Sequence, residues 1–194
     1  MPVLVDDDAS QARLVERLRA RLAARYPAGV DVIETHISRV LLAGEFAYKL
    51  KRPVNLGFLD FSTLARRRHF AEEEVRLNRR LAAPLYLGVV PISGTLAEPR
   101  IGSDGAALEY AVKMRRFPQA ALLTRHPLTP RVADALAERI ADFHARVPPA
   151  PPDSDYGTPA QVLAPMLENF AGIRGAVPVD AALAEPLERL ERWT

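Results

Sequence analysis

Residues 46–51 read Phe-Ala-Tyr-Lys-Leu-Lys, and a segment rich in charged and apolar side chains follows them as far as Leu81. Successive side chains of a strand alternate, so Lys49 and Lys51 would share one face of the hexapeptide. A loop punctuated by Pro and Gly separates this strand from residues 60–82, whose apolar spacing predicts a helix. The strand, the loop and the helix decide the fold that we expect.

A glutamate lies on the apolar face of that predicted helix. Spacings of four, three and four residues place one carboxylate among three apolar side chains: Phe70, Glu74, Leu77 and Leu81. A carboxylate that faces an interior needs a cation, because burying a lone charge is costly. The preceding strand offers Lys49 and Lys51. Spacing alone also allows an ordinary salt bridge at the edge of an amphipathic helix.

Composition bounds the remaining choices. The chain has 194 residues, enough for one ordinary domain or two small ones. Its 26 Lys+Arg against 24 Asp+Glu give a net charge of +2, so bulk charge favours neither nucleic acid nor membrane. No cysteine is present, which excludes disulfides and cysteine nucleophiles. No basic leader followed by an apolar stretch and no membrane-spanning run occurs, so we expect a cytoplasmic protein without membrane contact.

The elements around the lysine strand predict an α+β fold. We expect a five-stranded antiparallel sheet with one long helix inserted after its third strand, as a two-layer lobe. An arginine-rich amphipathic helix should precede the sheet, and a hairpin-like excursion at 93–106 should separate the last two strands. The expected elements are a helix at 8–26, strands at 30–37, 39–43, 46–51, 87–92 and 108–116, and the helix at 60–82.

Beyond residue 117 strand patterns stop and helix patterns take over. Thr129-Pro130 is a good helix start, and the helices expected here cover about 129–147, 159–173 and 179–193. We therefore divide the chain into residues 1–117, a mixed lobe with an N-terminal helix, and residues 118–194, a helical portion.

Two arginine-rich stretches, residues 13–25 and 66–80, could bind an anionic partner. Both lie on predicted amphipathic helices, and the triplet Arg66-Arg67-Arg68 should face outward. A solvated helix surface explains such stretches more often than a nucleic-acid interface does. We therefore rank nucleic-acid binding lowest among the functions considered.

The sequence lacks the common nucleotide and hydrolase motifs, including the P-loop and the G-x-G-x-x-G turn. What it has is a constellation of an Ala47-x-Lys49 pattern on a third strand, Glu74 on the next helix and a fifth strand that leads into helices. Protein-kinase-like folds use such an arrangement to hold a lysine on ATP phosphates. The turn at residues 35–38, where such folds cover the phosphates, has no glycine and offers Ser38 instead.

Longer segments carry a resemblance. Residues 34–51 (ETHISRVLLAGEFAYKLK), 55–64 (NLGFLDFSTL) and 67–81 (RRHFAEEEVRLNRRL), continued by 113–118 (KMRRFP) and 140–146 (IADFHAR), resemble the bacterial aminoglycoside-phosphotransferase-like family of predicted kinases. In some members of that family this half precedes a P-loop kinase half. The resemblance implies a protein-kinase-like N-lobe followed by the first helices of a helical C-lobe, with ATP in the cleft and Mg²⁺ on its phosphates.

The resemblance also implies roles for individual residues. Lys49 would contact the α- and β-phosphates, and Glu74 would hold Lys49. Lys51 is the alternative lysine and Glu73 the alternative glutamate. The remaining nucleotide contacts would be Ala47 against the adenine, Ser38 over the phosphates, and Met114 and Arg115 in the hinge at 113–117.

One departure limits this interpretation. Members of the family carry an H-G-D-x-H-x-x-N catalytic loop and a metal-binding Asp, and neither occurs here. That loop would follow the last residues, Arg192-Trp193-Thr194, so we expect an interrupted chain without catalytic or metal-binding residues. The acceptor substrate stays open. A non-catalytic kinase-like interaction module, self-associating through an exposed seam, is the second hypothesis.

Overall fold

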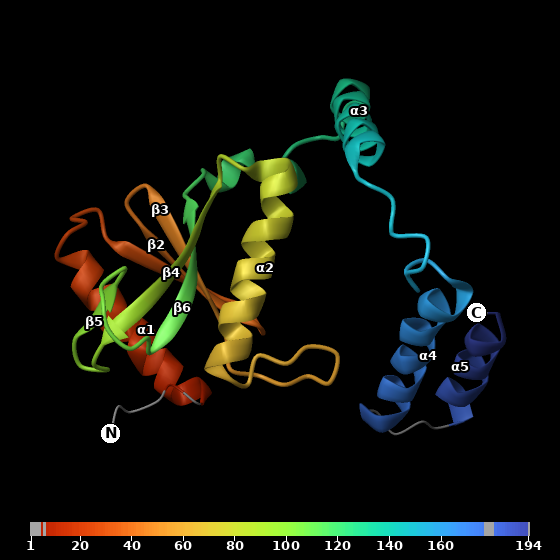
Figure 1. The fold of residues 1–194 in the computed structure, drawn as a ribbon, viewed down its shortest axis with the longest axis horizontal. Coiled ribbons are helices and arrows are strands. Elements are labelled where there is room, and N and C mark those ends of the chain that lie inside the picture. Colours follow the sequence, from red (N-terminus) through yellow and green to blue (C-terminus); the bar gives the residue numbers. More distant parts are fainter. Residues whose placement is uncertain (1–4, 6, 177–180, 194) are drawn as a thin grey trace. The chain divides into compact units, whose positions relative to one another are not determined.

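A computed structural model describes Val5 and residues 7–176 and 181–193, and Figure 1 shows its elements. The chain forms two compact units, residues 1–134 and 135–194. The first unit contains the whole sheet and two long helices. The elements of the second unit are helices in the residues that the structure describes there. The division of the chain at residue 117 into a mixed lobe and a helical portion, inferred from composition, stays a prediction.

The first unit is built on an antiparallel sheet in the order β1-β2-β3-β6-β4-β5. The predicted meander of the first three strands is confirmed, but the prediction of five strands is wrong, because the sheet has six in the described chain. The excursion at 93–106 contributes the extra strand by pairing Ile101 with Ile92. The strands are β1 (Val30–Glu34), β2 (Ser38–Ala43), β3 (Phe46–Lys51), β4 (Tyr86–Gly94), β5 (Pro99–Ile101) and β6 (Glu109–Arg115).

Helices cover both faces of this sheet. Helix α1 (Asp8–Ala23) packs Leu14 and Leu18 into a core with Tyr48 and Leu50 of β3. Helix α2 (Leu64–Ala82) covers the opposite face, where its small side chains meet β6. Figure 1 shows the sheet between α1, in red, and α2, in yellow. The unit therefore has three layers, and the predicted two-layer arrangement is corrected.

Helix α2 begins after Thr63, whose hydroxyl accepts a hydrogen bond from the backbone of Arg66. It buries Ala71 and Val75 against Val112, with exposed fractions of 2%, 7% and 0%. The predicted apolar face is wrong in this respect, because its large side chains are exposed: Phe70, Leu77 and Leu81. Small side chains form the contact between α2 and the sheet, because they let the helix backbone approach the strands closely.

A buried ion pair joins three elements of the unit. The side chains of Arg67 and Glu109 are both 0% exposed, and Arg67 Nε lies 2.8 Å from Glu109 Oε2. Gln11 of α1 donates to the same carboxylate oxygen at 2.7 Å, and Arg67 also donates to the carbonyl of Val5 at 2.8 Å. Burial raises the pKa of Glu109 while the Arg67 guanidinium opposes that effect. The prediction that Arg67 faces outward is wrong.

The second unit contains most of α3 (Pro130–Arg146), together with α4 (Pro159–Ala176) and α5 (Ala181–Trp193). Helices α4 and α5 contact each other, and Arg174 forms an ion pair with Glu191 across them. The start predicted for the last helix, at Val179, lies outside the described residues. None of the described helices has the length and apolar character needed to cross a membrane.

Candidate functional site

The structure brings Lys49, Lys51 and Glu74 together on the α2 side of the sheet. Lys49 Nζ donates to Glu74 Oε1 at 2.9 Å, and Lys51 Nζ donates to Glu74 Oε2 at 2.7 Å. Alternation along β3 gives both lysines the same face, and Glu74 reaches them from the third turn of α2. One carboxylate therefore bridges two ammonium groups.

The side chains of Lys49, Lys51 and Glu74 are only partly shielded from solvent. The side chain of Glu74 is 12% exposed, that of Lys51 9% and that of Lys49 30%. Burial raises the pKa of Glu74, but hydrogen bonds and charge from Lys51 and Lys49 outweigh it and leave that pKa below its ordinary value. Glu74 is therefore ionised at neutral pH.

The two lysines differ in how tightly they are held. Lys51 is nearly buried and its ammonium group lies 4.9 Å from the ring centroid of Phe61. Lys49 has the more exposed side chain and can meet an anion from solvent while Lys51 keeps Glu74 neutralised. The alternative glutamate, Glu73, forms an exposed ion pair with Arg76 at 2.6 Å.

A cavity of about 390 Å³ lies on the same side of the sheet as the lysines. Ala47 lines it and stands two residues before Lys49, which separates their Cα atoms by about 7 Å along the strand. The register sets Ala47 between Leu42 and Met114. The lining comes from all three meander strands, from α2, from the start of β4 and from the end of β6 with the residues that adjoin these elements: Ile33, Val40, Leu42, Ala47, Asn78, Ala82, Leu85, Tyr86, Met114, Arg115, Arg116, Phe117 and Gln119.

The predicted hinge segment forms one rim of this cavity. Met114 pairs with Ala47 and Tyr86 in the sheet, and the backbone N–H of Arg115 donates to Leu85 at 2.8 Å. The Arg115 side chain points to solvent, with Glu45 3.8 Å away. Phe117 follows the end of the strand and stays 40% exposed at the rim.

Ser38 stands apart from the cavity and is not among its lining residues. It is 4% exposed at the start of β2, opposite Lys51 in the register. Its hydroxyl lies 2.9 Å from that of Thr35, which also accepts the Ser38 backbone N–H at 2.9 Å. These bonds hold the turn at residues 35–38 in shape, and they occupy the hydroxyl that the sequence offered for a phosphate.

No group of three or more His, Asp or Glu side chains is placed to hold a metal ion in the described parts of the chain. The arginine-rich stretches are interrupted by acids, because Arg19 pairs with Glu16 and Arg68 with Glu72. Such alternation of sign breaks up a continuous basic surface.

Sequence reasoning missed part of the apolar lining of the cavity. Ile33, Val40 and Tyr86 come from three different strands, and only their register with Ala47 brings them together. The signal that could have found Val40 is its alternation with Arg39 and Leu41 in β2. Tyr86 carried no such signal, since it is the first residue of its strand and only three residues separate it from the end of α2.

Comparison with known proteins gives relatives of unknown role. Over 121 residues the chain is 39% identical to uncharacterized proteins of Mycobacterium bovis and of two strains of Mycobacterium tuberculosis. The match covers 60% of this chain and 23% of each relative, so the chain spans less than a quarter of their length. No family model and no solved structure matches.

Proposed function

We propose that this chain is the ATP-binding portion of a small-molecule kinase, with a protein-kinase-like first lobe. Such an enzyme transfers the γ-phosphate of ATP to a hydroxyl acceptor. The adenine would enter the cavity beside Ala47, and Lys49 would contact the phosphates. ATP is a cytoplasmic metabolite, so we also propose a cytoplasmic location.

The observation that carries the proposal is that Glu74 bridges Lys49 and Lys51 next to an apolar cavity. A nucleotide needs a flat apolar slot for its base and a cation at a fixed distance for its phosphates. Ala47 and Met114 supply small and flexible apolar surface, and Lys49 lies about 7 Å further along the strand. Glu74 keeps Lys49 extended along the sheet at 2.9 Å.

Binding and positioning are the roles that these residues can fill. Phosphoryl transfer also needs a residue that orients the acceptor and ligands for Mg²⁺. The sequence has no such loop, and metal chemistry would reach this site only with the bound ATP. We therefore expect the chain to bind Mg-ATP weakly and to show little transfer activity alone.

Calorimetric titration of the full chain with Mg-ATP tests the proposal. Lys49→Ala should weaken binding about ten-fold or more, because a charge-assisted contact to phosphate is lost. Ala47→Leu should do the same by filling the cavity. Glu73→Gln is the matched control, because this carboxylate pairs with Arg76 away from the cavity.

Circular dichroism must show that each variant keeps the wild-type fold. Binding that is unchanged in Lys49→Ala and in Ala47→Leu would overturn the assignment of this site. Loss of binding in Glu73→Gln as well would point to a general effect on stability.

A non-catalytic interaction module is the second candidate. Phe70 is 37% exposed and Leu77 45% exposed on α2, on either side of Glu74 along the helix. Apolar side chains in that position suit a protein partner. Size-exclusion chromatography discriminates, since concentration-dependent self-association that Phe70→Ser/Leu77→Ser abolishes, without any ATP binding, would favour this candidate.

A further inference from the structure

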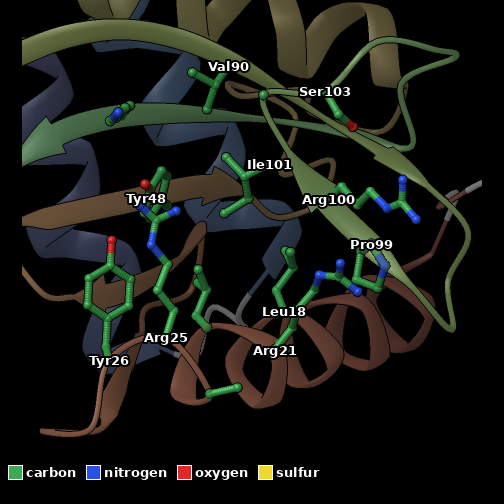
Figure 2. A pocket seen from close by; sticks show the side chains of 14 residues that line it. Leu18, Arg21, Arg25, Tyr26, Tyr48, Val90, Pro99, Arg100, Ile101 and Ser103 are labelled. Atoms are coloured by element: carbon green, nitrogen blue, oxygen red, sulfur yellow. The ribbon is translucent and has the colours of Figure 1, made fainter.

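A second hollow of the first unit lies on the other face of the sheet. Its volume is about 850 Å³, and it is bounded by the second half of α1, by β3 and β6, and by the β4–β5 hairpin. Figure 2 shows Leu18, Val90 and Ile101 lining it together with polar side chains from the surrounding elements. This hollow is separate from the cavity beside Ala47, because the sheet lies between them.

The charged side chains of the lining are all cations. Arg21, Arg25, Arg100 and Lys113 contribute four positive charges, and no Asp or Glu lines the hollow. Within the described chain Arg21, Arg25 and Lys113 form no ion pair with a carboxylate, and Lys113 Nζ lies 4.0 Å from the ring centroid of Phe46. Arg100 lies at the limit of an ion pair, with Glu98 at 4.0 Å. Four like charges around one concavity repel each other, so an anion there is favourable.

Two tyrosines, Tyr26 and Tyr48, line the hollow together with these cations. Tyr48 is only 6% exposed, and no described residue forms a hydrogen bond with its hydroxyl. The guanidinium carbon of Arg25 lies 5.8 Å from the ring centroid of Tyr26, and Figure 2 labels both residues and Tyr48 among the side chains that line the hollow. The Tyr48 hydroxyl is not among the buried side-chain atoms that lack a partner in the described chain, so it faces the open hollow and is reached by solvent. A ligand oxygen can accept a hydrogen bond from it.

The position of the Tyr26 ring depends on a glycine that lies against it in space. Gly44, in the turn between β2 and β3, has φ +58° and lets the Tyr26 ring lie against its backbone. A side chain at this position would displace the ring. The turn therefore fixes the Tyr26 ring beside the hollow, where the guanidinium carbon of Arg25 lies 5.8 Å from the ring centroid.

We propose that this hollow binds a small aromatic phosphate monoester. Its volume is in the range of small-ligand sites, and its apolar floor suits a planar ring. Guanidinium groups recognise phosphate oxygens in a bidentate manner, and the two tyrosine hydroxyls add neutral donors. The ring of the ligand lies over Leu18 and Ile101, and its phosphate lies between Arg25 and Tyr48.

Titration of the full chain with 1-naphthyl phosphate, followed by calorimetry, tests this site. Arg25→Gln and Tyr48→Phe should each weaken binding, Arg25→Gln by about ten-fold or more. Arg19→Gln is the matched control, because Arg19 lies on the same helix but pairs with Glu16 outside the hollow. Tyr48→Phe removes one oxygen atom and leaves the core packing in place.

Three results would overturn the proposal. Unchanged binding in Arg25→Gln and Tyr48→Phe would remove the site, and equal affinity for 1-naphthol would show apolar binding without phosphate recognition. Equal weakening in Arg19→Gln, together with binding of a single-stranded oligonucleotide, would show a general basic surface. Lys49→Ala should leave 1-naphthyl phosphate binding intact, so this test is independent of the proposed ATP site.

Discussion

Replacement of Glu74 by glutamine tests the central feature of the first unit. The substitution keeps the shape of the side chain and removes the charge that neutralises Lys49 and Lys51. Because Lys51 is only 9% exposed, it would be left as a nearly buried cation beside a second one. Breaking a buried pair from one side costs about 3–5 kcal/mol, and the partial exposure of Lys49 puts the expected loss near the lower limit, about 3 kcal/mol.

The lysine variants should follow a different order. Lys49→Ala leaves the Lys51–Glu74 contact of 2.7 Å intact and removes a partly exposed group, so it should cost less than about 1 kcal/mol. Lys51→Ala also removes the contact with Phe61 and should cost about 2 kcal/mol. For Mg-ATP binding the order of the two lysines reverses, with Lys49→Ala the more damaging.

Acid should weaken this feature in the wild type. The lysines hold the pKa of Glu74 below its ordinary value of 4.5 in the folded protein, against the opposing effect of burial. The stabilisation is therefore present above about pH 4.5 and is lost as the pH falls through the lower pKa of the folded state. Glu74→Gln lacks this contribution, so its stability should fall less steeply over the same acid range.

Urea unfolding followed by circular dichroism measures these differences, with Glu73→Gln as the control that should leave the midpoint unchanged. Thermal unfolding should agree, since a loss of about 3 kcal/mol lowers the midpoint by about 6–12 °C in a chain of this size. A Glu74→Gln variant as stable as the wild type would refute the reasoning. So would a Lys49→Ala variant that is destabilised as strongly as Glu74→Gln.

Two further predictions concern the core and one turn. Arg67→Met should cost about 3–5 kcal/mol in urea unfolding, because it leaves Glu109 buried without its cation, and Arg67→Met/Glu109→Leu should recover part of that loss. Recovery of nothing would contradict the pairing. Gly44→Ala should lower the midpoint of thermal unfolding more than Gly57→Ala, since both have positive φ but only Gly44 lies against a ring, that of Tyr26. Equal shifts would show that backbone strain alone is responsible.

The sequence was most informative where the placement of charged residues agreed with the alternation of a strand or the spacing of a helix. Lys49 and Lys51 share a face because they are two residues apart, and Glu74 was recognisable as a carboxylate needing a cation. The meander of three strands also followed from local patterns and the Gly44-Glu45 turn. Each of these inferences rests on neighbours in the chain, where alternation and helical spacing are reliable.

The buried face of α2 could not be found by the same means. Large apolar side chains contribute most to the hydrophobicity of a helix face. The sequence therefore predicted the face of Phe70 and Leu77 as the buried one, whereas Ala71 and Val75 are buried. The spacing of four residues from Arg67 through Ala71 to Val75 was visible, but an arginine at its head argued against burial. Its partner Glu109 lies 42 residues away, and only the folded sheet brings the two together.

The short strand β5 was missed for a related reason. Three residues, Pro99–Ile101, are too few to show alternation, and proline is poor in a strand interior. Pairing with β4 makes the strand, since Ile101 and Ile92 face each other across the hairpin. The N-terminal helix was predicted, whereas its position over the second face of the sheet depends on tertiary packing.

Strand β3 lies between the hollow next to α1 and the cavity beside Ala47. Only the thickness of its backbone separates the two spaces. Ala47 and Lys49 belong to one side, and Tyr48, between them, belongs to the other. A ligand that pushes this strand toward α2 enlarges the space next to α1 and narrows the space beside Ala47. Two occupants that displace the strand in opposite senses would compete without touching, and each would weaken the other by the same factor.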